Sequence, residues 1–133
     1  MKPKVLFLCV ANSARSQMAE AMGNHFWGEQ FQFLSAGSHP GTPHPIALST
    51  LKNKGIDTEK LHSKPMSDFK LDEMDYVITL CAEEYCPTIR GNKIHWPFSD
   101  PSDCIHSEQP QAFDQTYEKI KTKIGLFFTH QVN

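Results

Sequence analysis

The chain has 133 residues, of which 39% are hydrophobic and 21% charged, and its formal net charge is −2. This size suits one globular domain around a single core, so we predict one domain over residues 1–133. The balanced charge, without a basic or acidic tail, argues against nucleic acid and membranes as partners. No stretch reaches the ~18 apolar residues of a transmembrane helix.

The first predicted element is a strand over residues 5–10, a continuous apolar run typical of a strand buried on both faces of a parallel sheet. With Lys2 and Lys4 before it, the run could also imitate a secretion signal. We favour the strand because the run is short and a helical pattern follows directly. The four cysteines then indicate thiol chemistry or metal binding in the cytoplasm rather than a disulfide framework.

Helices and strands alternate along the rest of the chain. The expected strands are 31–35, 75–81 and 93–97. The expected helices are 16–27, 44–54 and 111–130. Gly55 would stop the second helix, a polar stretch over 57–72 carries a turn at 63–68, and a loop covers 98–110. This alternation predicts a three-layer α/β domain, in which a parallel sheet carries helices on both faces.

The loop after the first strand carries a reactive pattern, because Cys9 and Arg15 form a Cys-x5-Arg motif followed by Ser16. Such a loop turns successive backbone N–H groups toward one point, and the helix N-terminus adds partial positive charge. Arg15 offers a planar fork for two oxygens of a tetrahedral anion. These groups would favour the thiolate form of Cys9. We predict a nucleophile aimed at a bound oxyanion; the alternative is a buried structural cysteine and a surface arginine.

Two further cysteines lie near the predicted end of the third strand, where ligands bind in such sheets. Cys81 ends that strand, and Cys86 follows five positions later. They could be two small hydrophobic residues. A zinc site fits less well because the histidines are scattered and no Cys-x2-Cys pair exists, so we expect no metal. A redox interpretation uses their position, since Cys81 could approach Cys9 and Cys86 could reach back to Cys81.

An Asp-Pro pair follows the fourth strand, with Asp100 as a candidate proton donor for an oxygen that leaves the central atom. An isolated Asp-Pro is usually only a turn, and Asp103 is a nearby rival. Cys104 lies in the same polar loop, and we assign it no role.

The stretch from Val5 to Glu20 resembles the opening of the low-molecular-weight protein tyrosine phosphatase superfamily, and within it the arsenate reductase branch. The similarity extends over 35–37, 75–86, 95–97 and 100–101. It implies a low-molecular-weight phosphatase-like fold with sheet order 2-1-3-4. The oxyanion-binding loop it implies consists of Val10, Ala11, Asn12, Ser13, Ala14 and Arg15. By this resemblance, Asn12 braces the loop, Arg15 clamps the anion, Ser16 stabilises the thiolate and Asp100 is the general acid.

The resemblance also implies a reaction. Cys9 attacks arsenate while Asp100 helps water depart; Cys81 then attacks the sulfur of Cys9 and arsenite leaves. Cys86 next attacks Cys81 and passes the oxidation outward. An external thiol donor, thioredoxin or else glutaredoxin, resets the enzyme, and no bound cofactor is expected. The implied protein is a cytoplasmic monomer that serves arsenic detoxification.

Two other functions stay open. A phosphatase acting on phosphotyrosine or small phosphoesters would need the same Cys9, Arg15 and Asp100. Family phosphatases typically have Pro where Gln17 stands and Tyr where Ser102 stands, and both differences favour reduction. A noncatalytic anion-binding or thiol-sensing module is the third interpretation.

Some members of this branch bind potassium beside the loop. Asn12, Glu20 and Ser35 match that site, but Lys64 stands where an aspartate is expected. We predict that the Lys64 ammonium replaces the cation and that no potassium is bound. The alternative is a solvated lysine on a loop.

Overall fold

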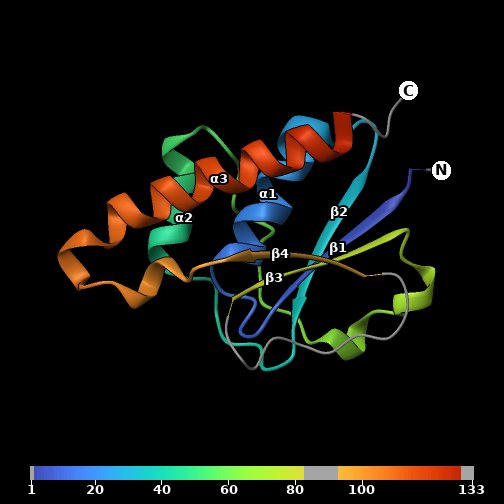
Figure 1. The fold of residues 1–133 in the computed structure, drawn as a ribbon, viewed down its shortest axis with the longest axis horizontal. Helices are drawn as coiled ribbons and strands as arrows, with labels where there is room; N and C mark the ends of the chain where they lie inside the picture. Colours follow the sequence, from blue (N-terminus) through green and yellow to red (C-terminus); the bar gives the residue numbers. More distant parts are fainter. Residues whose placement is uncertain (1, 83–92, 130–133) are drawn as a thin grey trace.

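The computed structural model describes residues 2–82 and 93–129. Its centre is a sheet of four parallel strands in the order β2-β1-β3-β4, which confirms the predicted topology. The strands are β1 Lys4–Cys9, β2 Gln32–Gly37, β3 Tyr76–Cys81 and β4 Lys93–Phe98. Because β1 lies between β2 and β3, its carboxyl end is flanked by the ends of both neighbours (Figure 1).

The two faces of the sheet are covered differently. The α-helices of the described residues lie on one side of it (Figure 1), and they are α1 Arg15–Trp27, α2 Pro45–Asn53 and α3 Gln109–Thr129. On the other side, single 3-10 turns pack on the sheet, namely η1 Met66–Asp68 and η2 Leu71–Glu73. Helices were predicted on both faces of the sheet. The structure has α-helices on one face and 3-10 turns on the other.

The burial of strand β1 on both faces explains why its sequence does not alternate between polar and apolar residues. Val5 and Phe7 lie in the large core shared with the α-helices, while Leu6 and Leu8 lie in the smaller core under the 3-10 turns. Successive side chains of a strand point to opposite faces, so a strand covered on both faces is apolar throughout. This burial fixes the position of Cys9, the residue with which β1 ends.

The predicted loop over 98–110 is wrong in part. It contains two 3-10 turns, η3 Pro101–Asp103 and η4 His106–Glu108, and α3 already begins at Gln109. Pro110 did not delay the helix, because proline is tolerated in a first turn whose N–H groups have no partner within the helix. The predicted helix end at 130 lies outside the described residues.

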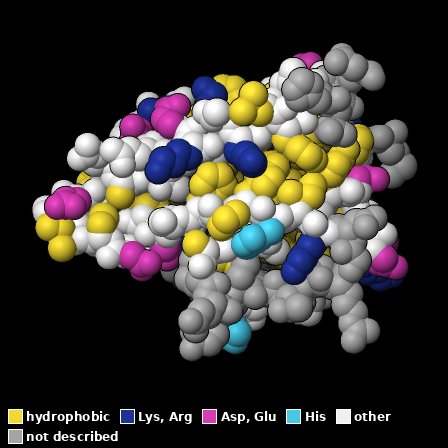
Figure 2. Space-filling model, in the orientation of Figure 1, with side chains coloured by type: hydrophobic (Ala, Val, Ile, Leu, Met, Phe, Trp, Pro, Cys, Tyr) yellow, Lys and Arg dark blue, Asp and Glu magenta, His cyan; other side chains and the backbone are white. Residues whose placement is uncertain are grey.

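Other boundaries differ by one or two residues, as helix and strand ends commonly do. Gly55 follows α2 with a φ of 78°, a left-handed conformation that suits the predicted stop. No helix within 2–82 and 93–129 is long and apolar enough to cross a membrane. On the part of the surface coloured in Figure 2, acidic and basic side chains are interspersed, in keeping with the balanced net charge.

Candidate active site

The loop between β1 and α1 turns its carbonyl groups outward. Three of its carbonyl oxygens accept hydrogen bonds from backbone N–H groups of residues 39–44, at 2.8, 2.9 and 2.9 Å; the pairs are Val10–His39, Ala11–Gly41 and Ser13–His44. In a trans peptide the N–H points away from the C=O, so the N–H groups that follow face the concave side. No side chain caps the N-terminus of α1, which begins at this concave side. The loop can therefore receive an anion.

Strand β2 passes close behind this loop at Gly37. A Cβ atom there would lie 2.6 Å from the carbonyl oxygen of Val10 and 2.8 Å from the backbone nitrogen of Asn12. Those distances are too short for any side chain, so glycine is required for the loop to rest against β2.

Asn12 links the loop to Cys9 through Ser16. It is fully buried and adopts a φ of 49°, in the left-handed region. Its Nδ2 donates to the hydroxyl oxygens of Ser16 at 2.7 Å and Ser35 at 2.9 Å. Because the Ser16 oxygen already accepts from Asn12, its own proton can be donated to the Sγ of Cys9, 2.8 Å away. A thiolate at Cys9 would thus have a hydroxyl donor in place.

Arg15 and Asp100 meet beside the loop. The Arg15 guanidinium is almost fully buried; its Nη1 donates to the carbonyl oxygen of Phe98 at 2.9 Å, and its Nη2 lies 3.6 Å from Oδ2 of Asp100. The other Asp100 oxygen accepts from the backbone N–H and the hydroxyl of Ser102, at 2.9 and 2.7 Å. Ser102 therefore orients the carboxyl group so that Oδ2 faces Arg15. The rival Asp103 lies in η3, where its backbone N–H donates to the carbonyl oxygen of Asp100 at 3.1 Å.

The groups matched to the potassium site also lie together. Oε1 of Glu20 accepts from the Ser35 hydroxyl at 2.6 Å and lies 3.3 Å from Nζ of Lys64. The backbone N–H of Lys64 donates to Oδ1 of Asn12 at 2.9 Å. With only 11% of its side chain exposed, Lys64 does not fit the alternative of a solvated lysine.

Three residues of the site had no assigned role in the sequence analysis. The Gln17 side chain donates to the carbonyl oxygens of Asn12 and His62, each at 2.9 Å, and the Ser63 hydroxyl donates to that of Asn12 at 2.6 Å. Gln17 adjoins the motif and could have been suspected on that ground. His62 and Ser63 lie about fifty positions away from the loop in a polar stretch, where nothing in the sequence signals the contact.

Cys81 is the last residue of β3, is fully buried and is disulfide-bonded, whereas Cys9 and Cys104 carry free thiols. Pairing of Leu8 with Thr79 brings the ends of β1 and β3 side by side. Alternation along the strands, however, separates the two cysteines. Cys9 contacts Ser16 on the helix side, while Cys81 follows Leu80, which packs in that same helix-side core, and so belongs to the opposite face. The prediction for Cys86 lies outside the described residues.

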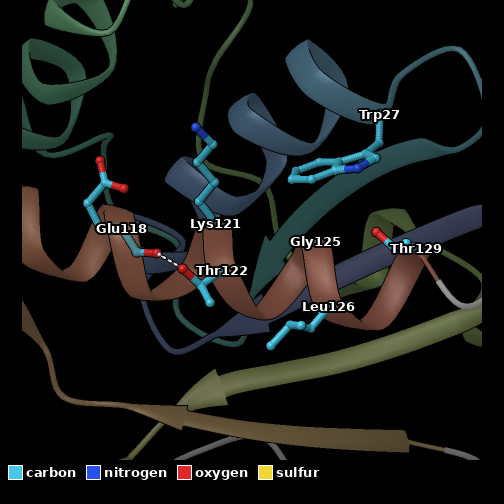
Figure 3. A pocket seen from close by; sticks show the side chains of 7 residues that line it. All are labelled: Trp27, Glu118, Lys121, Thr122, Gly125, Leu126 and Thr129. Carbon is cyan, nitrogen blue, oxygen red and sulfur yellow. Dashed lines mark hydrogen bonds between the residues drawn. The ribbon is translucent and has the colours of Figure 1, made fainter.

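A pocket of about 480 Å³ lies away from the loop, between the last residue of α1 and the side of α3. Figure 3 shows the side chains that line it. The Trp27 ring forms one wall, and Gly125 faces it from α3. The lining contains no thiol, and Trp27 is at the opposite end of α1 from Arg15. This hollow therefore shares no reactive group with the loop. No cluster of three or more potential metal-binding side chains occurs among the described residues.

Comparisons with known proteins show the family that the chain resembles. The sequence pattern of the family described as "Low molecular weight phosphotyrosine protein phosphatase" matches residues 4–133. Arsenate reductase 2 of Staphylococcus saprophyticus is 39% identical over 125 residues, covering 90% of this chain and 95% of that protein.

Two solved structures show the same likeness. An arsenate reductase in its phosphate-binding state superposes with a TM-score of 0.76 at 28% identity, covering 94% of this chain and 98% of that one. A thioredoxin-dependent arsenate reductase of Corynebacterium glutamicum superposes with a TM-score of 0.67 at 32% identity, covering 94% of this chain and 63% of that one.

Proposed function

The chain belongs to the low molecular weight phosphotyrosine protein phosphatase family, and from that premise we propose that it reduces arsenate to arsenite for arsenic detoxification. The observation that carries the proposal is the Cys9 sulfur, which lies 2.8 Å from the Ser16 hydroxyl at the start of a loop whose carbonyl groups are turned outward. Arg15, from the same motif, lies 3.6 Å from Asp100. The similarity to proteins named arsenate reductases supports arsenate as the substrate.

In the first step the Cys9 thiolate attacks the arsenic atom and a sulfur–arsenic bond forms. One arsenate oxygen leaves as water, for which Asp100 supplies a proton. Arg15 and the loop N–H groups hold the remaining oxygens. Arsenic keeps its oxidation state in this step, so the same groups could equally transfer a phosphoryl group.

Reduction occurs in the second step. The thiolate of Cys81 attacks the Cys9 sulfur, a Cys9–Cys81 disulfide forms, and the sulfur–arsenic bond breaks with its electron pair on arsenic. Arsenic gains two electrons and the two sulfurs lose them. Because alternation puts the two cysteines on opposite faces of the sheet, Cys81 must turn toward Cys9. It is the last residue of β3, where rotation disturbs the least strand pairing.

In the third step Cys86 attacks Cys81, which leaves Cys9 reduced and the oxidation in a Cys81–Cys86 pair. A free Cys9 together with a disulfide-bonded Cys81 is the state in which this step ends. An external dithiol then reduces the pair. We infer thioredoxin as the donor from the likeness to the thioredoxin-dependent enzyme, with glutaredoxin as the other candidate. Such donors keep thiols reduced in the cytoplasm, where we place the protein.

Lys64 takes the place of a bound cation in this proposal. Its ammonium lies beside Glu20, which accepts from Ser35, and both Ser35 and Lys64 contact Asn12. The ammonium neutralises Glu20 and keeps it aligned with Ser35, and Ser35 in turn fixes Asn12. We therefore expect that the enzyme does not require potassium.

Phosphatase activity is the second candidate function, since the family name and the groups Cys9, Arg15 and Asp100 suit it as well. Reduction and hydrolysis differ in their need for the other two cysteines. The experiment is therefore arsenite production with thioredoxin and its reductase, comparing wild type with Cys81→Ser and Cys86→Ser. Cys104→Ser is the matched control.

A reductase predicts that both test variants lose multiple turnover while they keep whatever aryl-phosphate hydrolysis the wild type has. Normal turnover in either variant would refute the relay. Hydrolysis by the wild type without any arsenite production would assign the protein to the phosphatases.

A further inference from the structure

Gln17 has contacts that core packing alone does not explain. Its side chain is fully buried, and its Nε2 lies 2.9 Å from the carbonyl oxygen of Asn12, 3.1 Å from Oδ1 of Asn12 and 2.9 Å from the carbonyl oxygen of His62. Its Oε1 is buried too, yet has no hydrogen-bond partner in the part of the chain that is described. A buried amide oxygen without a partner lowers stability, so any favourable contribution of the Gln17 amide comes from its nitrogen.

The orientation of this amide is fixed by its surroundings. All three neighbours of Nε2 are acceptor oxygens, so a flipped amide would place oxygen against oxygen three times. The two protons of Nε2 must be shared among the three acceptors. A side chain of equal length without a donor would leave the two oxygens of Asn12 with one donor fewer each.

Asn12 needs such support because its φ of 49° lies in the left-handed region, which side chains other than that of glycine adopt rarely. Among the described residues, Gln17 is the one whose side chain bonds both the main-chain and the side-chain oxygen of Asn12. It thereby fixes the peptide plane and the amide plane of Asn12 relative to each other. Ser63 and the backbone of Lys64 each hold only one of the two oxygens.

Both planes matter for the site. The outward Asn12 carbonyl turns the next N–H, that of Ser13, toward the concave side of the loop. The Asn12 amide donates to Ser16, which leaves the Ser16 proton for Cys9. Donors on Oδ1 polarise the amide and make its N–H groups stronger donors. Gln17 thus acts at once on the anion-binding N–H groups and on the donor to the nucleophile.

We propose that Gln17 is a positioning residue that holds the loop in its anion-binding form before an oxyanion arrives. The inference rests on the proposed function only in taking the loop as an oxyanion site. The loop then needs little ordering on binding, and binding energy that would have been spent on ordering appears as affinity. Once an oxyanion is bound, the anion itself orders the N–H groups.

The test is calorimetric binding of inorganic phosphate to the reduced protein. Gln17→Met keeps the length of the side chain and removes its donor. Gln32→Met is the matched control, since Gln32 is exposed at the start of β2, the end of the sheet far from the loop. We expect phosphate to bind about tenfold more weakly to Gln17→Met, corresponding to the loss of one hydrogen bond. Gln32→Met should bind phosphate as the wild type does.

A purely structural role is separated by one further readout. In arsenate turnover the KM should rise while kcat stays within about twofold, because bound substrate reorders the loop. Equal phosphate affinity and equal KM for arsenate in Gln17→Met and Gln32→Met would overturn the inference.

Gln17→Glu keeps the inference testable if Gln17→Met does not fold. Sulfate is the probe for this variant. A carboxyl group supplies at most one donor to the three acceptor oxygens, where the amide supplies two, so sulfate should bind more weakly than it does to the wild type. Wild-type affinity at neutral pH would contradict the inference. A wild type that binds phosphate but makes no arsenite would refute the proposed function and leave this inference standing.

Discussion

The loop from Cys9 to Ser16 and the segment from Asp100 to Cys104 meet at one edge of the sheet, but they are held in different ways. Asn12 in the loop is fully buried, and its partners come from α1, β2 and the stretch before η1. Asp100 keeps 25% of its side chain exposed, and apart from Arg15 its carboxyl group is held by Ser102 in its own turn. The loop is therefore held by contacts from distant parts of the chain, whereas the segment is held mainly by contacts within its own turn.

Because of this difference, we expect substitutions in the loop and in the segment to have different effects on activity. Changes in the loop should alter anion binding and nucleophilicity together, because the same contacts serve both. Changes in the segment should alter proton transfer and leave anion binding intact. Substitutions that mix these effects would show that the two regions act as one.

The largest loss is expected for Arg15→Lys in the loop. Lysine cannot form the planar fork, and its shorter reach would abandon the bond to the Phe98 carbonyl. We expect kcat/KM for arsenate to fall by about 10²–10³ and phosphate to bind more weakly. Steady-state kinetics and calorimetry measure both. A fall in kcat with unchanged phosphate affinity would contradict the assignment of Arg15 as the anion clamp.

Asp100→Asn should give the next largest loss, and in kcat alone. The amide cannot supply a proton, so kcat should fall by about 10²-fold while phosphate affinity stays within about twofold. Asp103→Asn is the control, because Asp103 is the nearby rival, and it should retain near-normal kcat. If Asp103→Asn shows the larger loss, the acid has been assigned to the wrong residue.

Lys64→Met should cost several-fold in activity and should create a response to potassium that the wild type lacks. It leaves the partly buried Glu20 without its cation, which we expect to lower the free energy of unfolding by roughly 1–3 kcal/mol. Activity titrated with potassium chloride against choline chloride is the measurement. A Lys64→Met enzyme that ignores potassium would contradict the replacement of a bound cation by the ammonium.

Lys54→Met provides the matched surface control for Lys64. A hydrogen bond to Asp114, aided by Glu118, raises the pKa of Lys54 above its ordinary value. The stabilisation is therefore fully present at neutral pH and is lost only as the pH rises through that raised pKa in the alkaline range. Because the pair is exposed and screened, Lys54→Met should barely change the unfolding temperature at neutral pH. If Lys54→Met lowered the unfolding temperature as much as Lys64→Met does, the expected difference between the less exposed Lys64 and the more exposed Lys54 would be wrong.

The smallest effect is expected for Cys104→Ser. The Cys104 thiol lies in the Asp100 segment and contacts the carbonyl oxygen of Pro101 at 3.3 Å, a bond that a serine hydroxyl can replace. Arsenite production with thioredoxin should match the wild type. A lost turnover would place a fourth thiol in the relay.

The sequence predicted best what is local or periodic. The four strands are short local segments, of which β1 is a continuous apolar run, and the loop motif is contiguous from Cys9 to Ser16. The turns η3 and η4 were missed because they are too short for hydrophobic periodicity. The contacts of Asn12 with Ser63 and of Gln17 with His62 join segments far apart in the chain. Such contacts depend on how the polar stretch before η1 folds over the loop, and no spacing rule encodes that.

The position of Cys81 also shows what the sequence alone does not predict. Its place at the end of β3 was predicted correctly, but the face of the sheet to which it belongs depends on strand register. The proposed relay therefore requires that the Cys81 side chain reaches Cys9 during the reaction.

The most direct test is a single turnover of Cys86→Ser with one equivalent of arsenate, quenched with acid and alkylated, followed by peptide mass spectrometry. The relay predicts one arsenite released per enzyme together with a Cys9–Cys81 disulfide, because the exchange that would remove this disulfide is blocked. Arsenite release while Cys81 remains fully alkylatable would contradict it.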